Sequence, residues 1–273
     1  MIAGELVEQL AVEGGLSTVL PGFEVRHEQV RLARAVSETL DTRGTLMAEA
    51  GTGVGKSFAY LLAAMDRIVN HGETVVISTH TIALQEQLLR KDIPLLMPLA
   101  GSDVRPVLVK GRGNYLSLRR LEVAQRRRSR LAGVDARSLD LMDAWSKTTT
   151  DGTRATLPQL PRASVWEHAE SDSNNCFGVK CPRYDECFYQ RARAAMQQGN
   201  LLVCNHALFF SDLALRIGGA TMLPHYDHVI FDEAHAIEDV AAEHFGMSVS
   251  EAGVERLLSL LLTADERRGS LSE

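Results

Sequence analysis

Short apolar runs alternate with amphipathic stretches in two parts of the chain. The apolar runs are bounded by turn-forming residues, as strands are, whereas the stretches between them show the spacing of a helix with one apolar face. The expected strands are Gly44–Ala48, Thr74–Ser78, Val104–Val109, Leu201–Cys204 and Val229–Phe231, and the expected helices are Lys56–Val69 and Ile82–Leu89. This alternation predicts an α/β fold, a parallel sheet with helices on both faces.

The alternation stops near Gly111 and resumes near Leu201. Between these points the chain is first basic, then loop-like from Ser146 to Ser164, and then rich in cysteine. Because the strand pattern returns afterwards, we expect an insert within one domain. The expected units are residues 1–110 and 200–240 as two halves of one lobe, residues 111–199 as the insert, and residues 241–273 as the start of a helical region in which Val254, Leu257, Leu258 and Leu261 share a face.

Composition narrows the class of protein. Hydrophobic residues make up 45% of the 273 residues and charged residues 23%, which excludes disordered and fibrous chains. No stretch approaches the roughly 20 apolar residues of a membrane span. Met1 to Gly15 contains no basic residue, unlike a secretory signal. The four cysteines lie in one short stretch, which favours a reducing compartment. We therefore expect a soluble, cytoplasmic protein with no membrane partner.

Positive charge is concentrated in one segment although the net charge is -6. The basic residues of this segment are Arg105, Lys110, Arg112, Arg119, Arg120, Arg126, Arg127, Arg128 and Arg130, and only Glu122 opposes them. A local basic stripe on an acidic protein can still bind phosphates, so the stripe predicts a nucleic-acid contact.

The segment Ala50–Ser57 has the pattern of a phosphate-binding loop. Glycines let successive backbone N–H groups face a phosphate, and the start of a helix adds positive potential. Lys56 would reach the outer phosphates and Ser57 would bind Mg²⁺. The alternative is a chance glycine-rich turn. The nucleotide-binding residues that the motif predicts are Ala50, Gly51, Thr52, Gly53, Val54, Gly55, Lys56 and Ser57, with Ala50 where the strict pattern has glycine.

A second acidic motif follows the last expected strand. The strand Val229–Phe231 delivers Asp232 to the carboxyl edge of the sheet, where it can hold Mg²⁺, and Glu233 is placed to polarise the attacking water. The alternative is an acidic turn that caps the next helix. We interpret His235 as a coupling residue, because no companion histidine stands at metal-ligand spacing.

An aromatic, a basic and an amide residue precede the first long helix. The ring of Phe23 can stack on a base, and the amide of Gln29 can read an adenine edge because it offers both a donor and an acceptor. A helix start with a buried aromatic residue is an equal alternative.

Cys176, Cys181 and Cys187 are separated by four and five residues. This spacing suits an iron–sulfur or zinc site, but three thiolates complete neither, and His168 is a candidate fourth zinc ligand. Cys204 ends an apolar strand and is assigned to the core. Aromatic and basic residues interleave around the cysteines, which suits either stacking on single-stranded bases or packing around a metal.

Taken in order, these motifs resemble the DinG/XPD family of iron–sulfur DNA helicases of superfamily 2, over about Leu20 to about Glu243. The motifs are Arg26-x-x-Gln29, the Ala50–Ser57 loop, Thr79-His80-Thr81 with Leu84–Leu88, Lys110–Leu116, the cysteine run, Asn205-His206 and the D-E-A-H sequence Asp232–His235.

The resemblance implies a RecA-like lobe that couples ATP hydrolysis to 5′-to-3′ movement on single-stranded DNA, with a role in DNA repair. It implies that Phe23, Arg26 and Gln29 contact adenine, and that Lys56, Asp232, Glu233 and His235 serve hydrolysis. The implied DNA-binding residues are Thr79, Thr81, Gln85, Arg112, Asn114 and Tyr115.

Two departures from the family pattern stand out. Ser117 takes the place of the first cluster cysteine, which puts a stable [4Fe-4S] cluster in question because such clusters prefer thiolates. Without it the insert would hold no metal, zinc or a labile cluster. We also expect the chain to lack the family's second motor lobe, which bears an arginine of the kind that accelerates phosphoryl transfer by about 10³–10⁵.

We therefore expect the N-terminal part of a helicase: an incomplete gene, an engineered fragment or a split subunit. One alternative is a fragment that binds nucleotide and DNA without helicase activity of its own. Another is an ATPase that acts on protein partners, because the ATPase motifs alone do not name a substrate.

Overall fold

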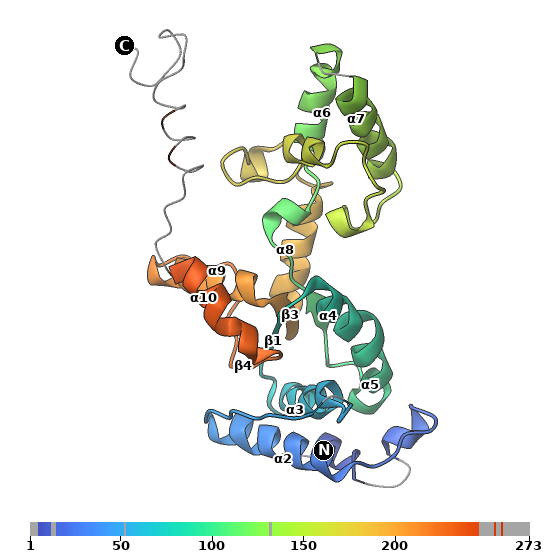
Figure 1. Cartoon of the computed structure of the whole chain (residues 1–273), viewed down its shortest axis with the longest axis vertical. Helices are drawn as coiled ribbons and strands as arrows, with labels where there is room; N and C mark the ends of the chain where they lie inside the picture. Colours follow the sequence, from blue (N-terminus) through green and yellow to red (C-terminus); the bar gives the residue numbers. More distant parts are fainter. Residues whose placement is uncertain are drawn as a thin grey trace.

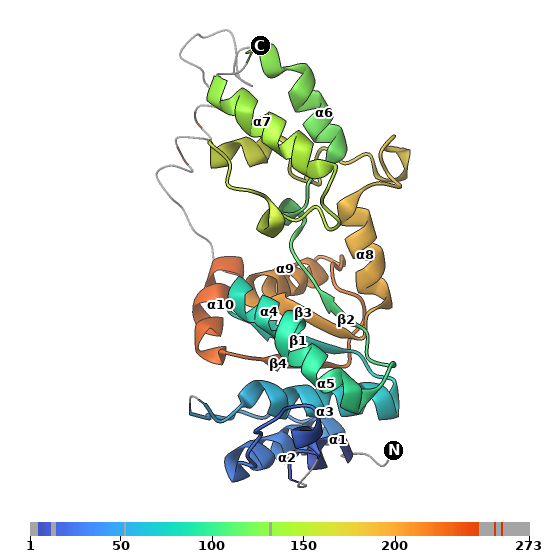
Figure 2. The same ribbon diagram turned by 90° about the vertical axis from the view of Figure 1, so that its right-hand side faces the viewer.

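A four-stranded parallel sheet organises the larger part of the molecule (Figures 1 and 2). The computed structural model describes residues 5–11, 15–51, 53–130 and 133–245, together with Val254 and Leu258. The strands, in the spatial order β2-β3-β1-β4, are β1 (Val75–Thr79), β2 (Pro106–Leu108), β3 (Leu201–Asn205) and β4 (His228–Phe231). The predicted α/β class with a parallel sheet is confirmed.

The strand β3 joins the two halves of the lobe. Its first residue, Leu201, lies opposite Val75 of β1 on one side and Pro106 of β2 on the other. The chain leaves the sheet after β2, forms the insert, and returns along α8 (Phe188–Gln198), which runs from the insert to the sheet in Figure 2. Segments from before and after the insert therefore share one sheet.

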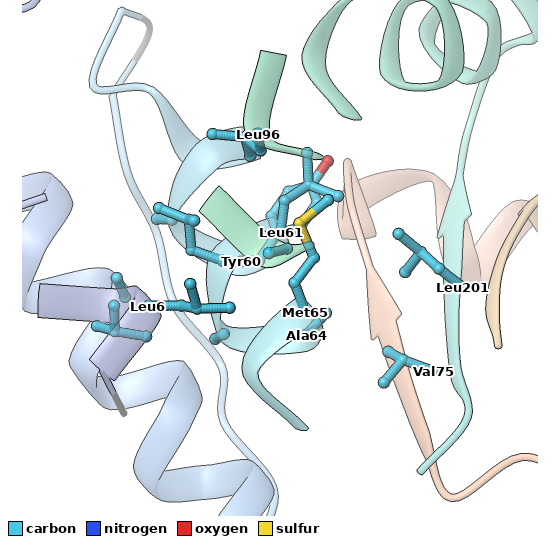
Figure 3. Packing of buried hydrophobic residues seen from close by; sticks show 14 of the residues in the cluster. Leu6, Tyr60, Leu61, Ala64, Met65, Val75, Leu96 and Leu201 are labelled. Atoms are coloured by element: carbon cyan, nitrogen blue, oxygen red, sulfur yellow. The ribbon is translucent and has the colours of Figure 1, made fainter. Parts of the chain in front are cut away.

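Both faces of the sheet are covered. Val75 and Ile77 of β1 belong to a core built with α3 (Lys56–His71), whereas Val76 belongs to a second core built with α9 (His206–Ile217). This alternation follows from the two-residue period of a strand. Because α3 lies between α2 (His27–Thr42) and the sheet, it is apolar on nearly all sides. Figure 3 shows its residue Met65 facing the strands.

The remaining α-helices have 4 to 14 residues. The α-helices not yet given are α1 (Glu5–Glu8), α4 (Ile82–Gln87), α5 (Ile93–Ala100), α6 (Leu118–Arg126), α7 (Gly133–Ser146) and α10 (Ile237–Phe245). A π-helical turn, Leu88–Asp92, joins α4 to α5. The 3₁₀ turns are Leu16–Thr18, Arg112–Asn114, Arg128–Arg130, Arg154–Thr156, Ala163–His168, Gly178–Lys180 and Ala234–Ala236. None of the helices in the described part of the chain has the length and apolar character to cross a membrane.

The predicted strand at Gly44–Ala48 is wrong, whereas the other predicted strands and helices are present with shifted ends. The side chain of Met47 is 95% exposed and that of Leu46 is exposed as well. A strand needs a neighbour for its backbone hydrogen bonds and burial for its apolar side chains. In the described sheet β4 pairs with β1 alone. The segment Gly44–Ala48 therefore has no neighbouring strand in this sheet, and its apolar side chains are not buried.

The insert has a core of its own. Its buried residues are Tyr115, Leu116, Leu121, Leu139, Met142, Trp145, Val165, Trp166, Ala169 and Phe188. Trp166 also donates a hydrogen bond from Nε1 to the carbonyl of Gly113 at 2.9 Å. The insert forms the upper body of Figures 1 and 2, away from the first helices. Of the predicted apolar face near the C-terminus, Val254 and Leu258 are exposed, and Leu257 and Leu261 lie outside the described residues.

Candidate nucleotide site and nucleic-acid surface

The predicted phosphate-binding loop ends where α3 begins. Gly53 and Gly55 have φ values of +82° and +85°, a conformation that favours glycine. A Cβ on Gly55 would lie 2.2 Å from Nε2 of Gln29, so a larger residue is strained by its conformation and would also displace the amide of Gln29. Lys56 follows directly as the first residue of the helix. Ala50 and Val54 are half-buried, Gly51 is exposed, and Thr52 lies outside the described residues.

Two of the three predicted adenine-contacting residues hold this loop. Arg26 Nη1 donates to the carbonyl of Gly53, and Gln29 Nε2 donates to the carbonyl of Gly55 at 2.9 Å. Gln29 is only 2% exposed, and its Oε1 accepts no hydrogen bond within the described structure. An adenine contact by Arg26 and Gln29 stays a prediction. Phe23 is half-buried against the main core.

Asp232 lies at the carboxyl edge of the sheet, as predicted from its position after β4. Its backbone N–H donates to the carbonyl of Ser78 at 2.8 Å. The hydroxyl of Tyr60 donates to its Oδ2 at 3.2 Å. Burial raises the pKa of the Asp232 carboxyl, the bond from Tyr60 opposes this, and the nearby Glu233 adds to it. Asp232 forms no salt bridge to another described residue, so a cation would stabilise its charged form.

The residues around Asp232 fit a magnesium ion. Mg²⁺ is usually held by one or two carboxylates together with hydroxyl, water and phosphate oxygens. The side chain of Ser57 interacts with Tyr60, the same residue that bonds Asp232. No group of three or more His, Cys, Asp and Glu side chains in the described ranges is arranged to hold a metal ion. A site with one carboxylate and one hydroxyl needs no such group.

Glu233 lies between a lysine and a histidine. Its Oε1 is 3.7 Å from Lys56 Nζ, and its Oε2 is 3.3 Å from His235 Nδ1. The backbone of Glu233 is left-handed, with φ +57°, which costs a residue with a side chain roughly 1–2 kcal/mol. His235 is mostly exposed. The structure thus brings together all four predicted catalytic residues; their catalytic roles stay predictions.

Tyr60 and Asp92 belong to this site but are absent from the predictions. Tyr60 is one helical turn after Lys56, so the two side chains lie on the same face of α3. This spacing is the signal in the sequence that could have identified Tyr60. Burial and the nearby Asp232 raise its pKa, so the phenol stays a neutral donor. Asp92 is buried in the π-helical turn; burial raises its pKa, and it accepts from Gln87 Nε2 at 3.3 Å. No local pattern reveals Asp92, because the tertiary fold brings it beside Ser57.

The predicted DNA-binding residues differ in access. The side chains of Thr79, Gln85 and Tyr115 are buried. Thr81 is exposed, and its Oγ1 accepts from the backbone N–H of Leu84 at the start of α4. Arg112 and Asn114 are half-buried in the 3₁₀ turn that opens the insert. Thr81, Arg112 and Asn114 are therefore the members of this set with side-chain surface for a ligand.

Aromatic rings near the cysteines are covered by arginines. The guanidinium of Arg112 lies 4.2 Å from the centre of the Tyr189 ring, and that of Arg119 lies 4.3 Å from the Phe177 ring. Other members of the basic stripe are bonded within the insert: Arg120 donates to backbone carbonyls and Arg128 pairs with Asp140. Much of the predicted stripe is thus used to hold the insert together.

The three cysteines surround a small cavity with the serine identified in the sequence. Cys176, Cys181, Cys187 and Ser117 all line a cavity of about 30 Å³. Ser117 Oγ caps α6 by accepting from the backbone N–H of Arg120 at 3.4 Å. A donor set of three thiols and a capping hydroxyl does not fit a four-thiolate iron–sulfur cluster.

The positions of His168 and Cys204 bear on whether either residue could be a fourth metal ligand. His168 is exposed and is not among the residues that line the cysteine cavity. Cys204 is fully buried, and burial raises the pKa of its thiol to about 12. The prediction that Cys204 is a core thiol is confirmed.

Comparisons with known proteins agree with this geometry. The family model described as DEAD/DEAH box helicase matches residues 32–128, which contain the loop, and the model described as DEAD_2 matches residues 174–254, which contain Asp232–His235. The chain is 36% identical over 252 residues to an ATP-dependent DNA helicase YoaA of Escherichia coli, covering 90% of this chain and 38% of the relative.

Two further relatives carry the name DinG. An ATP-dependent helicase DinG of Mycobacterium tuberculosis is 35% identical, with 78% of this chain and 34% of the relative covered. A 3′-5′ exonuclease DinG of Bacillus subtilis is 29% identical, with 93% of this chain and 27% of the relative covered. The chain therefore spans well under half the length of these relatives. It belongs to the DEAD/DEAH-box helicases and is similar to the N-terminal part of those named YoaA and DinG.

Proposed function

We propose that this chain binds MgATP and hydrolyses it under the control of single-stranded DNA, as the first motor lobe of a 5′-to-3′ DNA helicase. One observation supports the proposal above all: Lys56 meets Asp232 and Glu233, which are distant from it in sequence, at the carboxyl edge of the sheet. Ligands of open α/β sheets bind at this edge.

The loop and the start of α3 would receive the phosphates. The backbone N–H groups after Gly53 and the positive end of α3 favour an anion, and Lys56 adds a full charge. Ser57 and Asp232 would hold Mg²⁺, which shields the charge of the phosphates when bound. Gln29 and Arg26 fix the loop that carries these groups.

Glu233 is the proposed base. Lys56 now lies 3.7 Å from it, and the γ-phosphate of ATP would compete for that lysine. Glu233 would then accept a proton from the attacking water while the water oxygen bonds to the γ-phosphorus. The bond from that phosphorus to the bridging oxygen breaks, and ADP leaves. A second lobe would add the arginine that accelerates such transfers by about 10³–10⁵, so we expect slow turnover from this chain alone.

For DNA we propose contacts on the side where the insert meets the lobe. Thr81, Arg112 and Asn114 have accessible side chains there. A second candidate function is a fragment that binds nucleotide and DNA without turnover. The observation that favours it is the length of the relatives, of which the chain spans 38% and 34% in the YoaA and DinG helicases.

Nucleotide binding by three variants tests the proposed site. We expect Lys56→Ala to lose affinity for a fluorescent ATP analogue with Mg²⁺, and Glu233→Gln to bind it but hydrolyse no ATP. Lys147→Ala is the matched control, because this lysine lies on the surface of the insert. Wild-type affinity in Lys56→Ala would contradict the proposed site.

A further inference from the structure

His206 is a buried histidine beside the proposed catalytic turn. It is the first residue of α9 and is 1% exposed. Its Nδ1 lies 2.7 Å from the hydroxyl oxygen of Ser78 in β1. Its Nε2 is buried and has no hydrogen-bond partner within the described residues. A buried polar atom without a partner is unusual, and it marks a contact that another state of the protein can supply.

The neighbours of the ring indicate which nitrogen carries the proton. Burial and the nearby His80 lower the pKa of His206, whereas the backbone carbonyls of Glu233 and Asp232, which lie beside the ring, raise it. Ser78 also contacts the thiol of Cys204, whose pKa of about 12 keeps it a donor. A consistent chain of bonds then runs from this thiol to Ser78 and from Ser78 to Nδ1 of a neutral ring, leaving the N–H on Nε2.

The carbonyl groups that this N–H could use belong to a strained turn. Glu233 is left-handed at φ +57°, and its carboxylate is held by Lys56 at 3.7 Å. A phosphate that binds Lys56 would break this contact and leave His235 Nδ1, 3.3 Å from Oε2, as the remaining partner of the carboxylate. With one of its two contacts gone, the turn would rotate and bring the carbonyl of Glu233 or Asp232, both already beside the ring, into hydrogen-bond geometry with His206 Nε2.

Ser78 connects the same ring to the other proposed ligand. Its carbonyl accepts from Asp232 N–H at 2.8 Å, and its Cα is opposite Phe231 of β4 and Cys204 of β3. Thr79, His80 and Thr81 follow it at the end of β1, and the His80 ring centre is 6.2 Å from that of His206. A change at His206 therefore reaches the segment proposed to contact DNA.

We propose that His206 is a positioning residue that couples nucleotide binding to DNA binding. When phosphate takes Lys56 from Glu233, a carbonyl of the turn that already lies beside the ring completes a hydrogen bond with Nε2–H of His206. The ring then fixes Ser78 and the Thr79–Thr81 segment in the conformation that binds single-stranded DNA. This inference rests on the proposed function, since it needs a chain that binds both ligands.

The coupling is measured as a ratio of DNA affinities. The dissociation constant of a fluorescent oligo(dT) is determined with and without Mg²⁺ and a non-hydrolysable ATP analogue. We expect the analogue to tighten DNA binding by about tenfold in the wild-type chain, within the range of typical allosteric couplings. His206→Asn keeps a polar group near Ser78 but cannot reach the turn, and Ser78→Ala removes the other link. Each should bring the ratio to about 1.

A matched control separates coupling from folding. His228→Asn also removes a buried histidine, one that bonds Glu73 and follows Asp227 at the amino end of β4. It should keep the wild-type ratio. The double variant of Ser78→Ala and His206→Asn should lose no more coupling than either alone, because both break one path. If His206→Asn does not fold, the conservative Ser78→Ala carries the test.

The outcomes are distinct. An unchanged ratio in His206→Asn or in Ser78→Ala overturns the inference, and so does a wild-type chain that binds both ligands with a ratio of 1. A wild-type chain that does not bind the ATP analogue more tightly than Lys56→Ala overturns the proposed function itself, and the coupling falls with it.

Discussion

The lobe and the insert position their functional side chains in different ways. In the lobe, β4 delivers Asp232 to the carboxyl edge of the sheet, and Tyr60 of α3 bonds it there, so the loop that precedes α3 meets Asp232. In the described part of the insert, helices and 3₁₀ turns surround the core, and arginine side chains hold the cysteine region. The lobe therefore builds a site from backbone geometry, whereas the surface of the insert depends on side-chain packing.

The substitution with the largest expected effect, Trp166→Ala, should unfold the insert and leave the lobe folded. Trp166 is buried in the centre of the insert and bonds the carbonyl of Gly113. Trp166→Ala removes a large core side chain, which typically costs about 3–5 kcal/mol. We expect rapid proteolysis within residues 111–199 and loss of DNA binding, with MgATP affinity within about twofold of wild type.

Val179→Ala is the control for this experiment, because Val179 is an exposed residue of the same insert. If Trp166→Ala abolishes MgATP binding as well, the two regions fold as one unit and the comparison fails. Limited proteolysis and mass spectrometry identify where cleavage occurs.

The next effect concerns the lobe alone. Gly55→Ala combines a positive φ with a Cβ 2.2 Å from Nε2 of Gln29, so either the loop or the amide of Gln29 that holds it must shift. We expect MgATP affinity to fall by more than about tenfold, a loss of roughly 1.4 kcal/mol or more. Gly72→Ala is the matched control: Gly72 has φ +67° with no atom near its Cβ. It should lower the melting temperature but leave nucleotide affinity unchanged, as measured by calorimetry.

A smaller effect is expected from Tyr60→Phe. The change removes the hydroxyl that donates to Asp232 at 3.2 Å and keeps the buried ring. A typical hydrogen bond contributes about 0.5–1.5 kcal/mol net, so we expect the Mg²⁺ dependence of ATP binding to shift to several-fold higher concentration. Tyr226→Phe, near Arg216, should not shift it. A Mg²⁺ titration equal to wild type would remove Tyr60 from the site.

The smallest expected effect is a difference in alkylation between two thiols. Burial raises the pKa of Cys204 to about 12, so its reactive thiolate is scarce at pH 8, whereas Cys176 is exposed. We expect iodoacetamide to modify Cys176 in the folded chain and Cys204 only after denaturation, as read by peptide mass spectrometry. The thiolate fraction of Cys204 rises with pH, so any labelling in the folded chain should begin only in strong alkali. Fast labelling of Cys204 at pH 8 would contradict its place in the core.

These sites show how far local sequence can be interpreted. Lys56 and Asp232 stand in motifs whose spacing encodes their chemistry, and the strands that carry Asp232 and Cys204 were predicted correctly. The strand predicted at Gly44–Ala48 is wrong because an apolar run does not reveal whether a neighbouring strand exists.

Other features depend on contacts between distant segments. The order β2-β3-β1-β4 places Ser78 beside both Asp232 and His206, and nothing local to Ser78 indicates this. In the insert, the sequence indicated that aromatic and basic residues interleave, but not that Arg112 covers the ring of Tyr189. Pair contacts of this kind are set by tertiary packing.

The most direct test of the account is the rate of ATP hydrolysis by this chain with and without single-stranded DNA, with Lys56→Ala as the blank. The account predicts a slow rate that DNA increases in the wild-type chain and that is absent in Lys56→Ala. A wild-type rate no higher than that of Lys56→Ala under either condition would contradict the claim that these residues form a working ATPase site.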